Sequence, residues 1–197
     1  MRTLPFVSAL AVFAGLSGCV APVGPVQVTR FHVPDTAALG KGAIAVEPGP
    51  GADGKSLEWQ AYQVAVQRQL ALIGYTEAAA GQGGQVAELR LSRSSYQPGR
   101  SVSPVNVGLG GSTGSYGSGV GLGVGINLSP RPAQMVQTDL SIMIKQRATN
   151  QTLWEGRASF EVSAKSPLAD TALAAPKMAE ALFKDFPGQS GQTIEVK

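Results

Sequence analysis

The sequence predicts an α+β fold in two layers, in which two helices cover one face of a mostly antiparallel sheet. Four segments alternate apolar and polar residues with the period of two that a half-buried strand requires, and a fifth, short segment is also expected to be a strand. Two other segments repeat apolar residues at steps of three and four, which is typical of a helix packed on a core. A glycine-rich insertion, residues 99–134, separates the third strand from the fourth.

The strands are separated by turn signals. The first strand changes phase between Val28 and Phe31 and ends before Pro34, because proline cannot donate to a sheet ladder. The last two strands are joined by a turn at residues 148–151 and should form an antiparallel hairpin. A further short strand is expected around Ile194 and Val196. The five main strands are predicted at residues 26–33, 42–47, 87–96, 136–145 and 154–162.

The first helix is predicted to begin after Ser56, a capping residue, and to end at Gly74, which suits the left-handed position after a helix. The second helix should begin at Ser166-Pro167, since proline is favoured at the first helical position. Pro176 is expected to kink or split it. The helix should end at residues 186–188.

Composition excludes several classes of function. The chain has 197 residues and a formal net charge of only +3, which is too weak to indicate nucleic-acid binding. One cysteine excludes disulfides within the chain and zinc sites built of cysteines alone. One histidine, His32, excludes sites that need two imidazoles. We therefore predict no metal site and no dissociable cofactor.

The N-terminus has the form of a secretory signal peptide, residues 1–18, with one basic residue, Arg2, followed by a short apolar run. Leu16-Ser17-Gly18-Cys19 resembles the lipobox of bacterial lipoproteins. The resemblance implies cleavage between Gly18 and Cys19, a diacylglycerol on the Cys19 thiol, and an acyl chain such as palmitate on its amine. Several acyl chains give stable membrane anchoring.

The mature chain is then divided into a lipidated tether, residues 19–27, and a single domain, residues 28–197. The residue after the cysteine, Val20, is not aspartate. By resemblance to the known sorting rule, this favours the inner leaflet of the outer membrane, with the domain facing the periplasm.

The glycine-rich insertion is the least ordinary segment. Gly119, Gly121, Gly123 and Gly125 alternate with aliphatic residues, so a strand here would have one bare face and one apolar face. Two interpretations stay open: a flexible hairpin that contacts membrane, a partner or itself, or a disordered loop. A nucleotide-binding loop is disfavoured because no Lys-Ser or Lys-Thr follows the glycines.

Several motifs in order resemble the bacterial envelope lipoproteins grouped as domain of unknown function 4136. The motifs are the strand around Phe31, the helix end at residues 72–75, the strand at residues 87–89, the hairpin segment at residues 153–158 and the terminal Phe186-Pro187. The resemblance covers residues 26–187. It implies an envelope lipoprotein of unsettled function and supplies no catalytic residues.

We therefore predict a non-enzymatic module, anchored by lipid, that binds or scaffolds another envelope component. One alternative is a hydrolase acting on an envelope substrate. It would need a pocket that joins His32 to two carboxylates, for which the candidates are Glu58, Glu88, Asp139 and Glu155. Another alternative is a structural lipoprotein that self-assembles through the glycine repeat.

Trp59 and Trp154 are candidates for stacking on sugars or peptides. Trp154 falls on the apolar phase of its strand, so the core is the favoured position for it. Arg90, Arg93, Arg100 and Arg131 flank the glycine-rich segment, and a solvated strand edge is favoured over a contact with anionic lipid or glycan.

Overall fold

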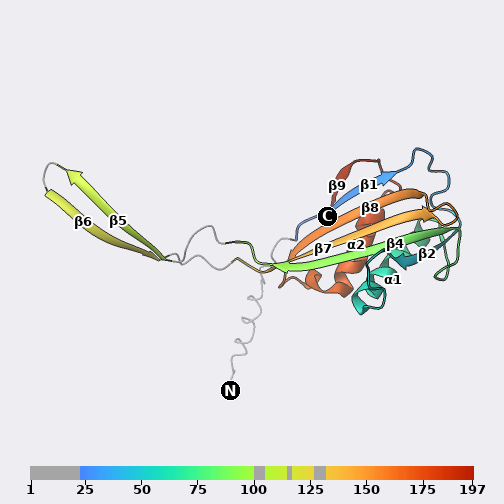
Figure 1. Ribbon diagram of the computed structural model, residues 1–197, viewed down its shortest axis with the longest axis horizontal. Coiled ribbons are helices and arrows are strands. Elements are labelled where there is room, and N and C mark those ends of the chain that lie inside the picture. The colour runs from blue at the N-terminus through green and yellow to red at the C-terminus, as the bar shows by residue number, and fades with distance from the viewer. Residues whose placement is uncertain (1–22, 100–104, 115–116, 127–131) are drawn as a thin grey trace, which may run out of the picture.

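The computed structural model describes residues 23–99, 105–114, 117–126 and 132–197. The predicted signal peptide and Cys19 lie outside these residues. Within the described residues the fold is mixed α and β, with a seven-stranded sheet, a separate two-stranded sheet and two α-helices (Figure 1). The prediction of one sheet combined with two helices is confirmed.

The seven-stranded sheet has the order β3-β2-β4-β7-β8-β1-β9. From β4 to β9 in this order, each strand pairs antiparallel with the next, whereas β2 pairs parallel with both β3 and β4. The parallel pairing follows from α1, which forms the crossover between β2 and β3. The strands are β1 Val26–His32, β2 Ala43–Pro48, β3 Thr76–Glu77, β4 Gln85–Tyr96, β7 Met135–Gln146, β8 Thr152–Ser163 and β9 Thr193–Val196.

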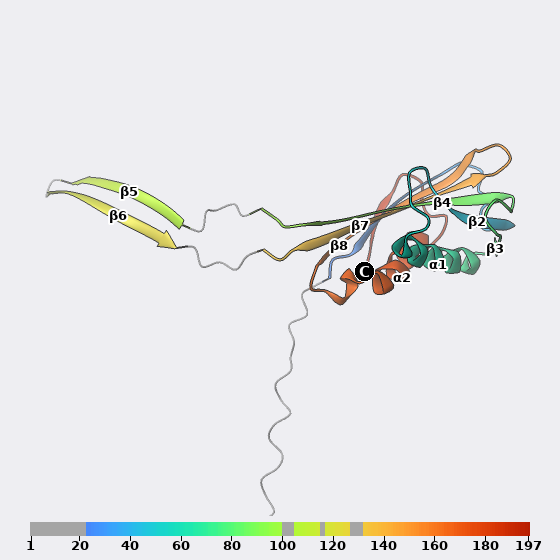
Figure 2. The ribbon, with the colours of Figure 1, turned by 60° about the horizontal axis from the view of Figure 1, so that its bottom comes forward.

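The helices α1, Leu57–Leu72, and α2, Thr171–Phe183, lie side by side against the same face of the sheet (Figure 2). Tyr62 of α1 and Met178 of α2 are both fully buried where the helices meet, with 3.7 Å between the tyrosine hydroxyl and the Met178 Sδ. Alternate residues of the central strands, such as Leu140 and Phe160, complete this core.

Helix α1 has the predicted ends. The Ser56 hydroxyl accepts the Trp59 backbone N–H at 3.1 Å, which satisfies one of the N–H groups left free at a helix start. Gly74 has a φ of 106° and packs against the backbone of Gly40, so a side chain at this position would be strained and would clash.

Helix α2 differs from the prediction of one helix that Pro176 interrupts. A short 3₁₀ turn, η1 Pro167–Ala169, comes first and α2 begins after Asp170. Ser166 and Asp170 each accept a backbone N–H, so each short element has its own N-cap. Pro176 lies inside α2 on its exposed side, where water can satisfy the carbonyl that loses its helical partner.

Strand β1 also differs from the prediction. The expected change of phase does not occur, because Arg30 continues the inward face and Phe31 points outward, with 43% of its surface exposed. Arg30 itself is only 4% exposed. Its guanidinium donates to the carbonyls of Leu182 and Ala181 at 3.0 and 3.1 Å, in the last turn of α2. The positive charge of Arg30 can be buried because the free carbonyl groups at the C-terminal end of α2 accept its hydrogen bonds.

Gly156 lies where the side chains of Trp154 and Leu182 leave no room for a Cβ atom. A Cβ atom at this position would lie 2.8 Å from Leu182 Cδ1 and would overlap the Trp154 ring. We predict that Gly156→Ala lowers the free energy of unfolding by about 2 kcal/mol, measured by urea denaturation. The control is Gly84→Ala, where a Cβ meets open space, and it should change stability by less than about 0.5 kcal/mol. Equal effects of the two substitutions would contradict this packing.

Burial of Tyr62 predicts a specific loss of stability in alkali. Burial raises the pKa of Tyr62 to about 12. Because the unfolded chain loses this proton near its ordinary pKa of 10.0 and the folded chain keeps it, the contribution of Tyr62 to stability should be constant below pH 10 and fall between about pH 10 and 12. The full loss is about 3 kcal/mol. Urea unfolding of Tyr62→Phe should show a shallower alkaline decline than the parent chain, and parallel declines would contradict the assignment.

Candidate functional site

The face of the seven-stranded sheet opposite the helices is polar and is not covered by another described element (Figure 2). The strand register sets its side chains in two rows across the sheet. One row joins Ser92, Asp139, Ser159 and Gln27. The next row joins Arg90, Ser141, Arg157, Thr29 and Thr193. We call these two rows the open face.

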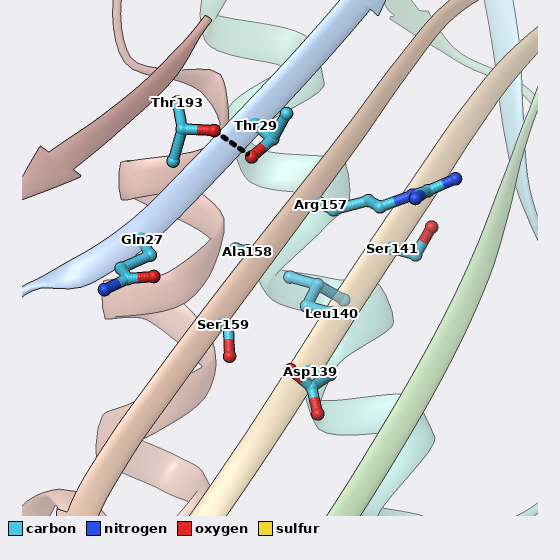
Figure 3. Close-up of a pocket in the computed structure, with 9 residues that line it drawn as sticks. All are labelled: Gln27, Thr29, Asp139, Leu140, Ser141, Arg157, Ala158, Ser159 and Thr193. Carbon is cyan, nitrogen blue, oxygen red and sulfur yellow. Dashed lines mark hydrogen bonds between the residues drawn. The ribbon is translucent and has the colours of Figure 1, made fainter.

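The open face contains a shallow pocket of about 210 Å³ at the junction of β1, β7, β8 and β9 (Figure 3). Its floor is formed by Leu140 and Ala158, which are buried. Its rim is formed by hydroxyl, amide and charged groups, and the Thr29 and Thr193 hydroxyls are 2.7 Å apart. The polar lining residues are Gln27, Thr29, Asp139, Ser141, Arg157, Ser159 and Thr193.

Two charged groups of opposite sign lie at this pocket. Arg157 is 65% exposed in its side chain and pairs with Glu155 at 2.6 Å. Asp139 accepts a hydrogen bond from the Gln137 amide at 3.2 Å. The pocket therefore offers both a hydrogen-bond acceptor with negative charge and a planar cation, among neutral hydroxyls. This arrangement suits the binding of a polar ligand.

The other predicted carboxylates have structural partners. Glu58 pairs with Arg93 at 2.8 Å, and Glu88 pairs with Lys145 at 2.9 Å. Arg93 also donates to the Thr171 hydroxyl and to the Ala169 carbonyl, so it joins β4, α1 and the start of α2. Glu58 and Glu88 thus hold elements together, and they lie apart from the open-face pocket.

A second pocket, of about 160 Å³, contains His32. The His32 Nδ1 atom lies 2.7 Å from the Val33 carbonyl oxygen, and the His32 Nε2 atom lies 3.2 Å from the Gly188 carbonyl oxygen. Glu155 is the single carboxylate among the residues that line this pocket. The pocket joining His32 to two carboxylates, which the hydrolase alternative requires, is therefore not formed by Glu58, Glu88, Asp139 and Glu155.

Both tryptophans are core residues. Trp154 is fully buried, its ring stacks on Phe183 with 5.3 Å between the ring centroids, and its indole donates to the Pro187 carbonyl at 2.9 Å. Trp59 is 4% exposed and donates to the Leu89 carbonyl. The favoured interpretation of Trp154 as a core residue is confirmed, and neither ring is available for stacking on a ligand.

The glycine-rich segment forms a two-stranded antiparallel sheet, β5 Val105–Gly114 and β6 Gly117–Ile126. In its register, Gly108 pairs with Gly123 and Gly110 with Gly121, while Val107 pairs with Val124. Gly119 pairs with Ser112 and Gly125 with Asn106. The backbone thus follows the hairpin interpretation, and like residues are paired in its middle part, from Val107↔Val124 to Gly110↔Gly121.

Some predicted site residues fall elsewhere. Gly18 and Cys19 lie outside the described residues, as do Arg100 and Arg131. Across the ranges that the structure describes, no group of three or more histidine, cysteine, aspartate and glutamate side chains could hold a metal ion. No helix in those ranges is both long and apolar enough to cross a bilayer.

The ion pair between Glu47 of β2 and Arg147, just after β7, affects the pKa of the glutamate. Burial acts to raise the pKa of Glu47, but hydrogen bonds from Arg147 and from the Gly81 backbone N–H outweigh it and hold this pKa below its ordinary value. Arg147 contacts Glu47 at 2.6 Å and also donates to the carbonyls of Gly83 and Gln82. These groups close the loop before β4 and are structural.

The family comparison agrees with the sequence motifs. The family model described as Domain of unknown function (DUF4136) matches residues 29–188. The chain belongs to this family. An uncharacterized protein of Zymomonas mobilis subsp. mobilis, which is 26% identical over 215 residues, covers 88% of this chain, and the match spans 80% of that relative.

Two solved structures resemble parts of the DUF4136 chain. A PDZ domain protein from Parabacteroides distasonis has a TM-score of 0.49 at 10% identity, and the match covers 88% of this chain but 39% of that protein. A PelC dodecamer from Paraburkholderia phytofirmans has a TM-score of 0.36 at 10% identity, covering 78% of this chain and 97% of the PelC chain. Both TM-scores are below 0.5, and we base no conclusion on them.

Proposed function

We propose that this DUF4136 protein is a lipid-anchored, periplasm-facing module of the cell envelope that binds another envelope component without catalysing a reaction. The observation that supports binding most directly is the open face. One side of the sheet is covered by helices, and the other presents a polar pocket that no described element occupies. A surface of this kind, held on rigid strands, is suited to binding.

The distribution of charged groups supports binding over hydrolysis. Glu58 and Glu88 are engaged in ion pairs that join secondary-structure elements. At the open-face pocket, Asp139 and Arg157 lie among hydroxyls, and His32 lies in the other pocket. General acid–base chemistry needs groups within hydrogen-bond reach of one reacting bond, and these groups are divided between two pockets.

Lipid anchoring is proposed from the Leu16-Ser17-Gly18-Cys19 motif. In the native bacterium, Cys19→Ala should move the protein out of the membrane fraction or leave it with an uncleaved signal peptide. Mass spectrometry of the parent chain should find an N-terminal Cys19 peptide that carries diacylglycerol and an acyl chain. An unmodified Cys19 in a membrane-associated parent chain would contradict the anchor.

The hairpin β5–β6 is proposed as a second contact segment, and its deletion separates binding from self-assembly. A chain lacking residues 105–128 should keep its folded sheet, because the hairpin pairs only within itself among the described residues. If the hairpin contacts a partner, the deletion should reduce the captured partner and leave the oligomeric size unchanged in native mass measurements. A fall in oligomeric size on deletion would instead support the self-assembling structural lipoprotein.

A further inference from the structure

The outer side of α1 is apolar although no described element covers it. Leu57, Val64 and Leu72 are 82%, 57% and 74% exposed. Their spacing of seven and eight residues places them along one side of a helix. Helix α1 is therefore apolar on two sides, because its inner side also buries residues against the core. The inner residues are Trp59, Tyr62, Ala65, Val66 and Leu70.

The outer side carries little charge. Arg68 is an exposed cation within the same stripe, and the neighbouring positions Ala61 and Ala71 are small and apolar. Leu173 of α2, which packs beside α1, adds another large side chain at 50% exposure. Several large apolar side chains exposed on one side of a helix mark a contact surface. An apolar stripe with a basic residue is typical of a helix that lies in the interface of a membrane.

The position of the tether favours the membrane as the occupant of this surface, and this step depends on the proposed lipid at Cys19. Residues 19–25 precede β1, and at about 3.5 Å per residue they reach at most about 25 Å. The start of β1 lies at the end of the sheet where α1 begins. Gln27 shares a cross-strand row with Ser92, and the next residue, Arg93, pairs with Glu58 in the first turn of α1.

We propose that the outer side of α1 lies on the lipid surface to which the chain is anchored. Leu57, Val64 and Leu72 enter the boundary between headgroups and acyl chains, and Arg68 meets lipid phosphate. The open face, on the opposite side of the sheet, then points away from the membrane toward its ligand. The short tether keeps the domain at a high effective concentration near the lipid surface, so a modest apolar stripe is sufficient for this contact.

The test uses the natively lipidated full chain, purified and reconstituted in vesicles of phosphatidylethanolamine and phosphatidylglycerol. Cys19 is the one cysteine of the chain, and lipidation consumes its thiol. Val64→Cys and Leu72→Cys can therefore each take a single environment-sensitive fluorophore, with Ser159→Cys on the open face as the matched control. Vesicles with bromine on the lipid acyl chains should quench the labels at positions 64 and 72 at least twofold, and leave the label at position 159 unchanged.

Equal fluorescence of the position-64 label in brominated and ordinary vesicles would overturn the proposal. Energy transfer between labelled copies without lipid quenching would overturn it in favour of a second copy of the chain on this surface. Circular dichroism of each variant checks that the fold is kept. The mass of the Cys19 peptide reports separately on the anchor: an unmodified Cys19 would overturn the anchor and this inference with it, whereas a lipidated Cys19 without quenching at position 64 would overturn this inference and leave the anchor in place.

Discussion

Replacing Trp154 with alanine should lower the free energy of unfolding by about 4 kcal/mol, the largest loss expected from a single core substitution in this chain. Trp154 has no exposed surface and contacts Phe183 and Phe186 with 5.3 Å between ring centroids in each pair. It therefore joins β8 to the end of α2 and to the segment that follows it. Urea denaturation followed by circular dichroism measures the change.

Trp154→Phe is the matched variant. It keeps an aromatic ring in the stack but removes the indole N–H that donates to the Pro187 carbonyl at 2.9 Å. We expect a loss of about 1 to 2 kcal/mol, since a smaller ring and one lost hydrogen bond are involved. Similar losses for the alanine and phenylalanine variants would contradict a core role of the stacked rings.

Replacing Arg30 with methionine should lower the free energy of unfolding by about 3 kcal/mol. Methionine keeps much of the volume but cannot donate to the carbonyls of Leu182 and Ala181, which have no partner within the helix. Burial lowers the pKa of the Arg30 guanidinium, and the nearby charge of Asp185 acts against this change. The cation is thus held by the C-terminal carbonyls of α2.

The control for this prediction is Arg157→Met, on the open face. Its side chain is 65% exposed, so solvent screens its ion pair with Glu155, and the expected change is below about 0.5 kcal/mol. The loss of stability for Arg30→Lys should be smaller than for Arg30→Met and larger than for Arg157→Met. Lysine keeps the charge but cannot donate to both carbonyls as the planar guanidinium does. An Arg30→Met variant as stable as the parent would refute the role of Arg30 at the helix end.

The elements with long, regular patterns could be predicted from the sequence. Helix α1 was predictable because Ser56 and Gly74 mark its ends, and the hairpin of β7 and β8 because strict alternation sets both faces. In each case the local pattern and the tertiary contacts agree. The Trp154 position was predictable for the same reason, since the apolar phase of β8 continues through it.

Arg30 could not be predicted, because its burial depends on the end of a helix more than 150 residues away in the chain. A charged residue in a strand normally points outward, and that rule produced the wrong phase for Phe31. The open face was also missed as a unit. Asp139, Arg157 and Thr29 each fall on the polar phase of a strand, but only the strand order brings them to one pocket.

The central claim is that the open face binds an envelope component while the domain is held at the membrane. The most direct measurement is photo-cross-linking in intact cells, with a photoreactive amino acid placed at Ser141 on the open face and, as a control, at Glu180 on the exposed side of α2. The account predicts one reproducible adduct of defined mass from position 141 that is absent from position 180. No adduct from position 141, or the same adducts from both positions, would contradict it.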